Sequence, residues 1–235
     1  SNAVLEAVQT TALPKGELTE PQTAIIDKQK PMVALTFDDG PHYTVTPRIL
    51  DILQEHNARA TFFVLGNRVD NFPNIIQREY SQGHEIGSHS FSHPQITTLT
   101  SDEIEYQFAE TEHRIQQYVP YTTKLVRPPY GQITQSLKEV LQKTFVLWSI
   151  DTQDWKTRDK DAIVSEVLNN VKDGDIILMH DMYSTTADAC EELIPALIER
   201  GYQLVTVSEL LNAKEITPVA GSVYSRVLST GNAAS

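Results

Sequence analysis

The stretch MVALTFDDGP, residues 32–41, has the pattern of a buried strand that ends in a tight turn. Its first six residues are apolar or β-branched, and Gly40 and Pro41 stop the run. Shorter apolar runs of the same kind follow at residues 61–65, 85–87, 145–150, 175–179 and 203–207. We therefore expect a series of short strands, of which residues 32–37 form the first.

Helical periodicity fills the intervals between these runs. We expect helices from Pro47 onward, around residues 75–80, over 101–118, from near 134, over 161–171 and 191–200, and a short one after 207. Ser101 and Glu105 flank an N-terminal capping pattern for the third of them. Strands that alternate with helices predict an α/β fold with a parallel sheet, here curled into an irregular barrel.

Composition excludes several classes of protein. The 19 basic and 31 acidic residues give a formal net charge of −12, which argues against a nucleic-acid partner and suits a neutral or cationic polymer. The single cysteine, Cys190, allows no internal disulfide. No apolar run approaches the roughly 18 residues of a membrane span. Residues 1–3 have the look of a tag remnant, so we expect a native export signal or anchor to have been removed.

Two motifs indicate a metal site. Asp38 and Asp39 follow the first strand, and two adjacent carboxylates repel each other unless a cation neutralises one of them. We expect Gly40 to let the chain turn so that both reach one cleft. His89 and His93 are four residues apart, the spacing that places two imidazoles on one side of a helical turn in zinc sites. Taken singly, each motif also fits a plain turn or a structural histidine.

Three further motifs follow later strands. RPPYG, residues 127–131, is a stiff loop of the kind that can aim backbone N–H groups at an oxyanion. DTQDW, residues 151–155, ends in Trp155, which is either a sugar-stacking platform or a core anchor. ILMHD, residues 177–181, delivers His180 at the tip of a strand, where it is a candidate general acid. Among the remaining histidines, His42 is the one expected near the cleft.

These five motifs, in this order, resemble those of the polysaccharide deacetylase family, also known as the NodB-homology domain or carbohydrate esterase family 4. The resemblance covers about residues 31–212, with a lead-in segment at 1–30 and a tail at 213–235. It implies a metal-dependent hydrolase that removes N-acetyl groups from an amino-sugar polymer, and among such enzymes we favour a resemblance to peptidoglycan N-acetylglucosamine deacetylases. Such enzymes act outside the cell or at the cell wall.

The resemblance also assigns a role to each motif residue. Asp39, His89 and His93 would hold zinc or another divalent ion such as cobalt. Asp38 would be the general base, His180 the general acid, and the backbone N–H of Tyr130 would stabilise the oxyanion. Arg127 and Asp154 would steady or tune these groups, and Trp155, Leu178 and Tyr130 would form the substrate pocket.

Three alternatives stay open at this point. The same scaffold suits a chitin or chitooligosaccharide deacetylase, an acetylxylan esterase or a muramic acid deacetylase, because the motifs determine the bond far better than the substrate. A non-catalytic sugar-binding module is a remote alternative, since it would be expected to have lost a ligand, the base or the acid.

Overall fold

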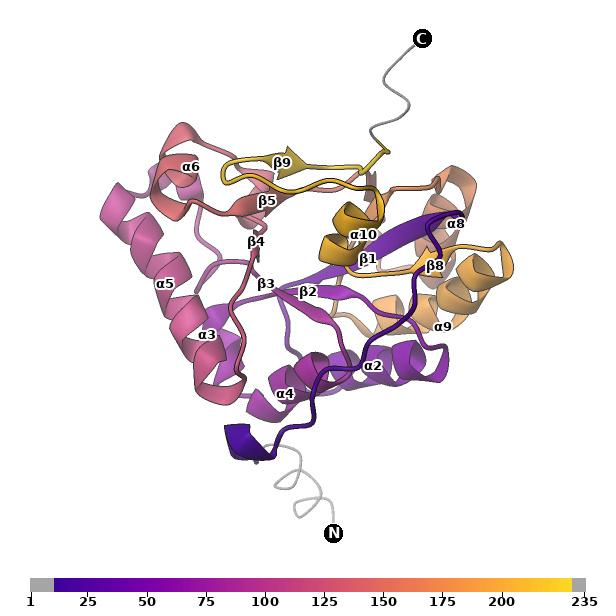
Figure 1. The fold of residues 1–235 in the computed structure, drawn as a ribbon, viewed down its shortest axis with the longest axis horizontal. Helices are drawn as coiled ribbons and strands as arrows, with labels where there is room; N and C mark the ends of the chain where they lie inside the picture. Colours follow the sequence, from indigo (N-terminus) through magenta and orange to yellow (C-terminus); the bar gives the residue numbers. More distant parts are fainter. Residues whose placement is uncertain (1–10, 230–235) are drawn as a thin grey trace.

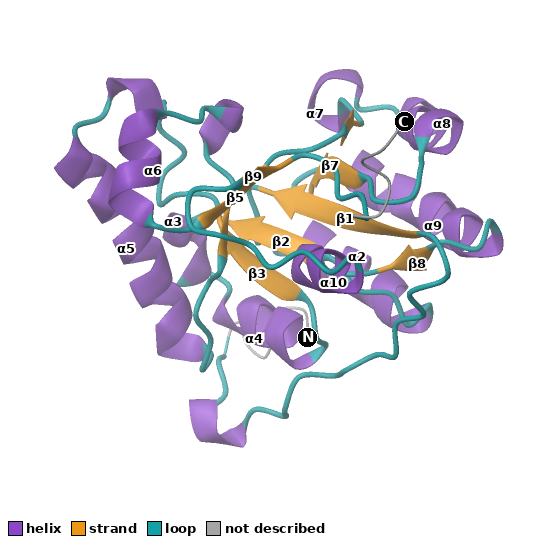
Figure 2. Cartoon of the chain, turned by 45° about the horizontal axis from the view of Figure 1, so that its top comes forward, coloured by secondary structure: helices purple, strands orange, loops and turns teal. Residues whose placement is uncertain are grey.

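The computed structural model describes residues 11–229, and residues 1–3, interpreted above as a tag remnant, lie outside them. Its centre is a single curled sheet in which the strands lie side by side and the helices cover the outside (Figures 1 and 2). The strands are β1 (Met32–Asp38), β2 (Thr61–Val64), β3 (Glu85–Ser88), β4 (Leu125–Val126), β5 (Thr144–Val146), β6 (Ile150–Asp151), β7 (Ile176–His180), β8 (Gln203–Leu204) and β9 (Val223–Tyr224).

One or two helices follow each strand except β5 and β9 within residues 11–229. They are α2 (Val45–Glu55), α3 (Gly66–Val69), α4 (Pro73–Ser81), α5 (Ser101–Tyr118), α6 (Gln135–Leu141), α7 (Asp154–Thr157), α8 (Lys160–Asn170), α9 (Ser184–Glu199) and α10 (Val207–Ala213). Three single 3₁₀ turns complete the set: η1 (Lys15–Glu17), η2 (Ile96–Thr98) and η3 (Pro129–Gly131).

The strands pair in the order β6-β7-β1-β2-β3-β4-β5-β9, and β8 pairs with one end of β1. Every strand pair is parallel. The predicted α/β class is confirmed, and the sheet forms a half barrel, since no pairing joins β6 to β9 within residues 11–229.

The register of the sheet brings the motifs together. Asp38 lies beside His180 in the pairing of β1 with β7, and Ser88 lies beside Val126 in the pairing of β3 with β4. His89 and Arg127 therefore follow directly from adjacent strand ends. Because all strands run the same way, their carboxyl ends meet at one edge, where α/β proteins place their sites.

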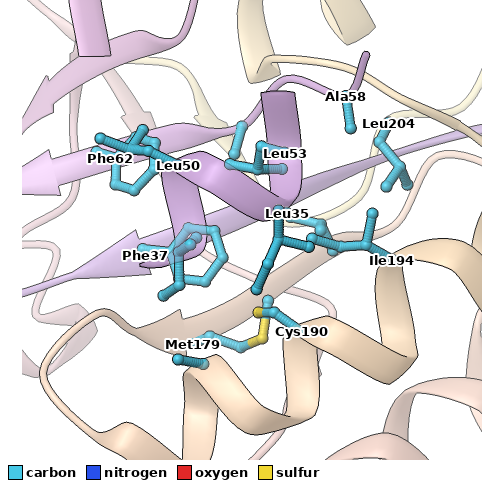
Figure 3. Packing of buried hydrophobic residues seen from close by; sticks show 14 of the residues in the cluster. Leu35, Phe37, Leu50, Leu53, Ala58, Phe62, Met179, Cys190, Ile194 and Leu204 are labelled. Carbon is cyan, nitrogen blue, oxygen red and sulfur yellow. The ribbon is translucent and has the colours of Figure 1, made fainter. Parts of the chain in front are cut away.

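The first strand lies at the centre of the core. All seven residues of β1 are buried, and Phe37 stacks on Phe62 of β2 with ring centroids 5.2 Å apart. Leu50 and Leu53 of α2 cover one side of this pair (Figure 3). The single cysteine, Cys190, packs into the same cluster with no exposed surface, which raises its pKa and leaves it a small apolar core residue.

Several predicted boundaries were wrong. The expected strand 145–150 is split into β5 and β6, because residues 147–149 carry the chain from β4 and β9, which pair with β5, across to β7, which pairs with β6. The helix expected at 191–200 begins about two turns earlier, at Ser184. The capping box of α5 uses Thr100 and Glu103, not Ser101 and Glu105, because the reciprocal pair needs a spacing of three residues.

Candidate active site

A cavity of about 420 Å³ opens at the carboxyl ends of β1, β3 and β7. Eight of the ten residues that the sequence singled out line it: Asp38, Asp39, His89, His93, Tyr130, Trp155, Leu178 and His180. The other two, Arg127 and Asp154, have no exposed surface and lie against the lining residues. The structure thus brings the whole predicted set to one place.

The two aspartates occupy the first strand end. Asp38 is the last residue of β1, and Asp39 turns the chain with a φ of 78°. The turn was expected at Gly40, which instead provides space, since a Cβ there would lie 2.2 Å from Oδ2 of the buried Asp181. The positive φ of Asp39 sends its carboxylate toward the histidines of the next loop.

His89 and His93 come from a loop, which corrects the expectation of a helical turn. His89 follows β3 directly, and both Ser90 and His93 have left-handed backbones, with φ values of 77° and 61°. The loop brings the rings within 4.9 Å of each other, centroid to centroid. Their Nε2 atoms lie 3.3 Å and 3.5 Å from the same oxygen, Oδ1 of Asp39.

These three residues fit a divalent metal ion. Their potential ligand atoms all lie within 4.8 Å of one another. Oδ1 of Asp39 is buried and accepts no hydrogen bond from residues 11–229, a costly state for a carboxylate unless a cation faces it. Nδ1 of His89 donates to the carbonyl oxygen of Arg127 at 2.6 Å, so its Nε2 carries the free lone pair, as in metal-bound histidines.

Charge supports the same interpretation. Burial by itself raises the pKa of Asp39, but the adjacent imidazole of His89 outweighs it and the pKa falls to about 2. Burial lowers the pKa of His93, and the neighbouring His89 lowers it further, so its imidazole favours the neutral form that a metal requires. A carboxylate and two imidazoles are ligands that suit zinc and similar ions.

Asp38 is held separately, by Arg127. The Arg127 guanidinium donates to Oδ1 of Asp38 at 2.8 Å and to the hydroxyl of Thr36 at 2.7 Å. Its Nε and Nη2 donate to the carbonyl oxygens of Val146 and Leu147, so that each nitrogen has an acceptor, and the guanidinium lies 4.3 Å from the ring centroid of Phe63. The buried charge is therefore fully satisfied, and Oδ2 of Asp38 remains on the side of His89, 3.6 Å from its Nε2.

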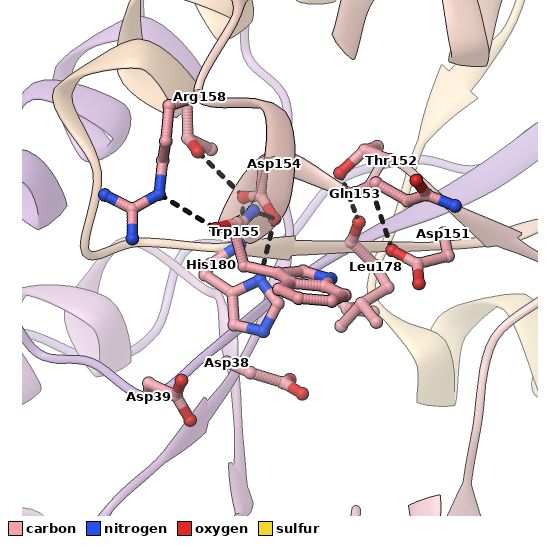
Figure 4. Close-up of polar contacts among 12 residues, drawn as sticks. Asp38, Asp39, Asp151, Thr152, Gln153, Asp154, Trp155, Arg158, Leu178 and His180 are labelled. Atoms are coloured by element: carbon pink, nitrogen blue, oxygen red, sulfur yellow. Dashed lines mark hydrogen bonds and ion pairs between the residues drawn. The ribbon is translucent and has the colours of Figure 1, made fainter. Parts of the chain in front are cut away.

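His180 is oriented by Asp154, as Figure 4 shows. The buried Asp154 carboxylate accepts from Nδ1 of His180 at 2.8 Å, and from the backbone N–H groups of His180 and Trp155 and the hydroxyl of Thr186. Burial by itself lowers the pKa of His180, but Asp154, with the charges of Asp38 and Asp39, raises it to about 9. The ring is thus held protonated on Nδ1 and presents Nε2 to the cavity.

Aromatic residues form the walls of the cavity. Trp155 and Tyr130 are 48% and 62% exposed, and Leu178 is buried beneath them. Tyr130 has a φ of 59° in the η3 turn, which places the polypeptide backbone of that loop at the cavity. Trp148 and Tyr183, which the sequence motifs did not single out, also line the cavity. Their signal is an aromatic residue within three positions of a strand end.

His42 does not line the cavity. Its Nδ1 accepts hydrogen bonds from the backbone N–H groups of Thr44 and Val45 at 3.3 Å and 3.2 Å, which satisfies the first donors of α2. The expectation that it sits in the cleft was therefore wrong, because a histidine beside a helix start can act as its cap.

The fold and the site together define a class of protein: an α/β half barrel with a cluster of carboxylates and imidazoles at the carboxyl ends of its strands. The chain belongs to the polysaccharide deacetylase family: the model of that family, described as polysaccharide deacetylase, matches residues 26–146. The peptidoglycan-N-acetylglucosamine deacetylase of Bacillus cereus is 40% identical over 193 residues, which is 79% of this chain and 70% of that protein.

Two further relatives extend the comparison. The peptidoglycan-N-acetylmuramic acid deacetylase PdaC of Bacillus subtilis is 44% identical over 203 residues, and its solved structure superposes with a TM-score of 0.80 over 81% of this chain and 94% of that one. A family 4 acetyl xylan esterase from Clostridium thermocellum, solved with a cobalt ion, has a TM-score of 0.80 at 37% identity, over 83% and 98% of the two chains. The chain spans 44% of the full length of PdaC.

Proposed function

We propose that this protein is a metal-dependent hydrolase that removes N-acetyl groups from an amino-sugar polymer, most of all from N-acetylglucosamine in peptidoglycan. One observation carries the proposal. A ligand set for a cation, a separate carboxylate and a protonated imidazole surround the same cavity. Amide hydrolysis needs an activated water, a stabilised oxyanion and a proton for the leaving amine.

Asp39, His89 and His93 would hold the metal, zinc or another divalent ion such as cobalt. The ion supplies Lewis acidity, which lowers the pKa of water and polarises a carbonyl group. The solved acetyl xylan esterase with cobalt supports this choice of ion for a related site.

The chain's own residues would move the protons. Asp38 would accept the proton of the attacking water, and the ion pair with Arg127 would hold its carboxylate in place. The backbone N–H of Tyr130 would donate to the oxyanion. His180, kept protonated beside Asp154, would deliver a proton to the departing amine. Trp155 and Leu178 would enclose the acetyl methyl group.

The names of the relatives support peptidoglycan as the substrate class. N-acetylmuramic acid is the second candidate, because PdaC bears that specificity in its name and is 44% identical. Chitooligosaccharides and acetylated xylan complete the set to be tested. A peptidoglycan substrate places the enzyme outside the cell or at the cell wall. Among residues 11–229, no helix is long and apolar enough to cross a membrane.

The test is release of acetate from a panel of substrates by metal-free protein to which zinc or cobalt is added back. We expect turnover of peptidoglycan strands to exceed that of acetylxylan, and a chelator to abolish it. Asp38→Asn is the matched variant: it should keep the bound metal and lose activity by about 10²–10⁴-fold, the usual contribution of a general base. Wild-type turnover in Asp38→Asn would remove the residue from this role, and no acetate from any substrate would refute the proposed function.

A further inference from the structure

Arg158 is an exposed side chain that is nevertheless held firmly beside the cavity. It ends α7, and its backbone has a left-handed φ of 47° and donates to the carbonyl oxygen of Asp154 at 3.1 Å. Its Nε donates to the carbonyl oxygen of Trp155 at 3.0 Å (Figure 4). The guanidinium carbon lies 3.5 Å from the ring centroid of Tyr183, the distance of a stacked cation–π contact.

These contacts place a positive charge at the rim of the catalytic cavity. Trp155 and Tyr183, the two residues that hold Arg158, both line that cavity. Tyr183 also faces the catalytic side, since its ring centroid is 6.0 Å from that of His180. The guanidinium of Arg158 and the imidazole of His180 therefore lie near the same ring, that of Tyr183.

The charge of Arg158 is not balanced by the protein. Within residues 11–229, no carboxylate lies within 4.0 Å of its guanidinium, whereas Arg48, Arg114 and Arg127 each form an ion pair. This is notable in a chain with a net charge of −12, where carboxylates are plentiful. Nε is already used and the guanidinium also lies within hydrogen-bonding range of the Tyr183 side chain, but it pairs with no carboxylate of residues 11–229. Its two terminal nitrogens form a planar pair of donors, the arrangement that binds a carboxylate in bidentate fashion.

We infer that Arg158 forms a carboxylate-binding subsite, which makes the enzyme prefer acidic glycan strands over neutral ones of the same length. The inference rests on the proposed function and narrows it. In peptidoglycan the carboxylate comes either from the lactyl ether of muramic acid or from the attached peptide, and both present the same chemistry to a guanidinium. Chitin offers no such group. The stacking on Tyr183 fixes the guanidinium in advance, so little side-chain freedom is lost on binding.

The test compares three tetrasaccharide substrates: chitotetraose, a peptide-free peptidoglycan tetrasaccharide with free lactyl carboxylates, and the same glycan with its peptides attached. Acetate release gives kcat/KM for each. We expect Arg158→Gln to lower the ratio of kcat/KM for at least one acidic substrate to kcat/KM for chitotetraose by about five-fold. The change should lie mainly in KM, because a contact that is equally strong in the ground state and the transition state affects KM and not kcat. The wild-type preference should also weaken as salt is raised, because an exposed ion pair is screened.

Two variants make the result specific. Lys156→Gln is the control, because it also removes one positive charge from α7. Lys156 is exposed and forms no ion pair with a carboxylate of residues 11–229. This variant should leave the preference for acidic substrates unchanged. Arg158→Lys keeps the charge and loses the planar fork, so it should restore only part of the preference.

The two acidic substrates then identify the carboxylate. A loss confined to the peptide-free glycan points to the lactyl group, and a loss confined to the peptide-bearing glycan points to the peptide. Equal losses on all three substrates overturn the inference. Calorimetric binding of the same glycans to wild-type protein and to Arg158→Gln tests the role of Arg158 independently of turnover. If the enzyme releases no acetate, the proposed function is refuted, but the difference in affinity between the two proteins still shows whether Arg158 binds a carboxylate.

Discussion

At the scale of single residues, the cavity combines groups that would each be unfavourable alone. A buried carboxylate oxygen without a donor, on Asp39, faces two imidazole nitrogens. The buried guanidinium of Arg127 is matched by Asp38, and the buried carboxylate of Asp154 is matched by His180. Two of these three arrangements are complete within the protein, and in the proposed function a cation would complete the first.

Removal of one imidazole tests this view of the metal site. His93→Asn keeps a residue type that tolerates the positive φ of 61°, while it replaces the imidazole with a weaker ligand. We expect the dissociation constant for zinc to rise by more than about 10-fold, since even outer partners of metal ligands contribute that much. Chelator competition measures it, with His113→Asn, on the exposed face of α5, as the control. An unchanged zinc content would exclude His93 as a ligand.

The pH dependence of activity tests the pairing of His180 with Asp154. The pKa of His180 is raised to about 9, so the proposed general acid stays protonated until the pH approaches that value, and the alkaline limb of kcat/KM should fall there. A bound cation offsets the charge of Asp39 but leaves the contact with Asp154. Asp154→Asn removes the main favourable partner, so the limb should move to lower pH by about one unit or more. If the alkaline limb of Asp154→Asn did not move, the limb would not report the ionisation of His180.

Residue types were easier to predict than the way the backbone presents them. The spacing of His89 and His93 indicated a helical turn, yet the two rings converge because Ser90 and His93 adopt left-handed conformations in a loop. Such conformations are rare for these residues and leave no periodic signal in the sequence. Arg158 was missed for a related reason: its importance lies in a stack on Tyr183, 25 positions further along the chain.

At the scale of elements, local signals predicted the existence of strands and helices better than their ends. Helix α5 was expected where it occurs, but its cap was misplaced by one residue. Thr100 and Ser101 are both good caps, and only Thr100 has a glutamate three positions later. The short strands β5 and β6 were merged into one, because three partly buried residues between them do not interrupt the apolar pattern.

The cap of α5 provides a prediction at this scale. Thr100 is exposed, and its side chain accepts from the backbone N–H of Glu103 while Glu103 accepts from the N–H of Thr100. Thr100→Ala removes one half of this pair without opening the core. We expect a loss of about 1 kcal/mol in the free energy of unfolding, measured in denaturant. Thr97→Ala, at an exposed threonine of η2, is the control and should change stability little; equal effects would show that the cap contributes nothing special.

At the scale of the whole molecule, the C-terminal segment joins parts of the chain that no local pattern connects. β9 extends the sheet beside β5, and Arg226 pairs with the buried Asp175 just before β7. Val227 is fully buried and belongs to the same apolar cluster as Met32 and Ile176. These pairings span long sequence separations and involve a strand of two residues, so hydrophobic periodicity gives no sign of them.

Gly174 is the point where this segment meets the central sheet. Its N–H donates to the carbonyl oxygen of Met32, and its carbonyl oxygen accepts from Val227, both at 2.8 Å. Its φ is 87°, and a Cβ would lie 2.0 Å from the carbonyl oxygen of Val227. Gly174→Ala therefore adds both backbone strain and a steric conflict that pushes the C-terminal segment away from the turn before β7.

Gly201 separates these two effects. It has a φ of 90°, and a Cβ there would meet nothing within 4 Å, so Gly201→Ala carries the strain alone. We expect Gly201→Ala to cost about 1–2 kcal/mol of unfolding free energy and Gly174→Ala about 2–5 kcal/mol, measured in the same denaturant. Only Gly174→Ala should also expose the residues after 221 to limited proteolysis, because only there does the conflict release the segment. If both variants lost the same free energy of unfolding and the C-terminal segment stayed protected from the protease, Val227 would have moved to make room for the added methyl group. Gly174 would then not be needed to hold the C-terminal segment in place.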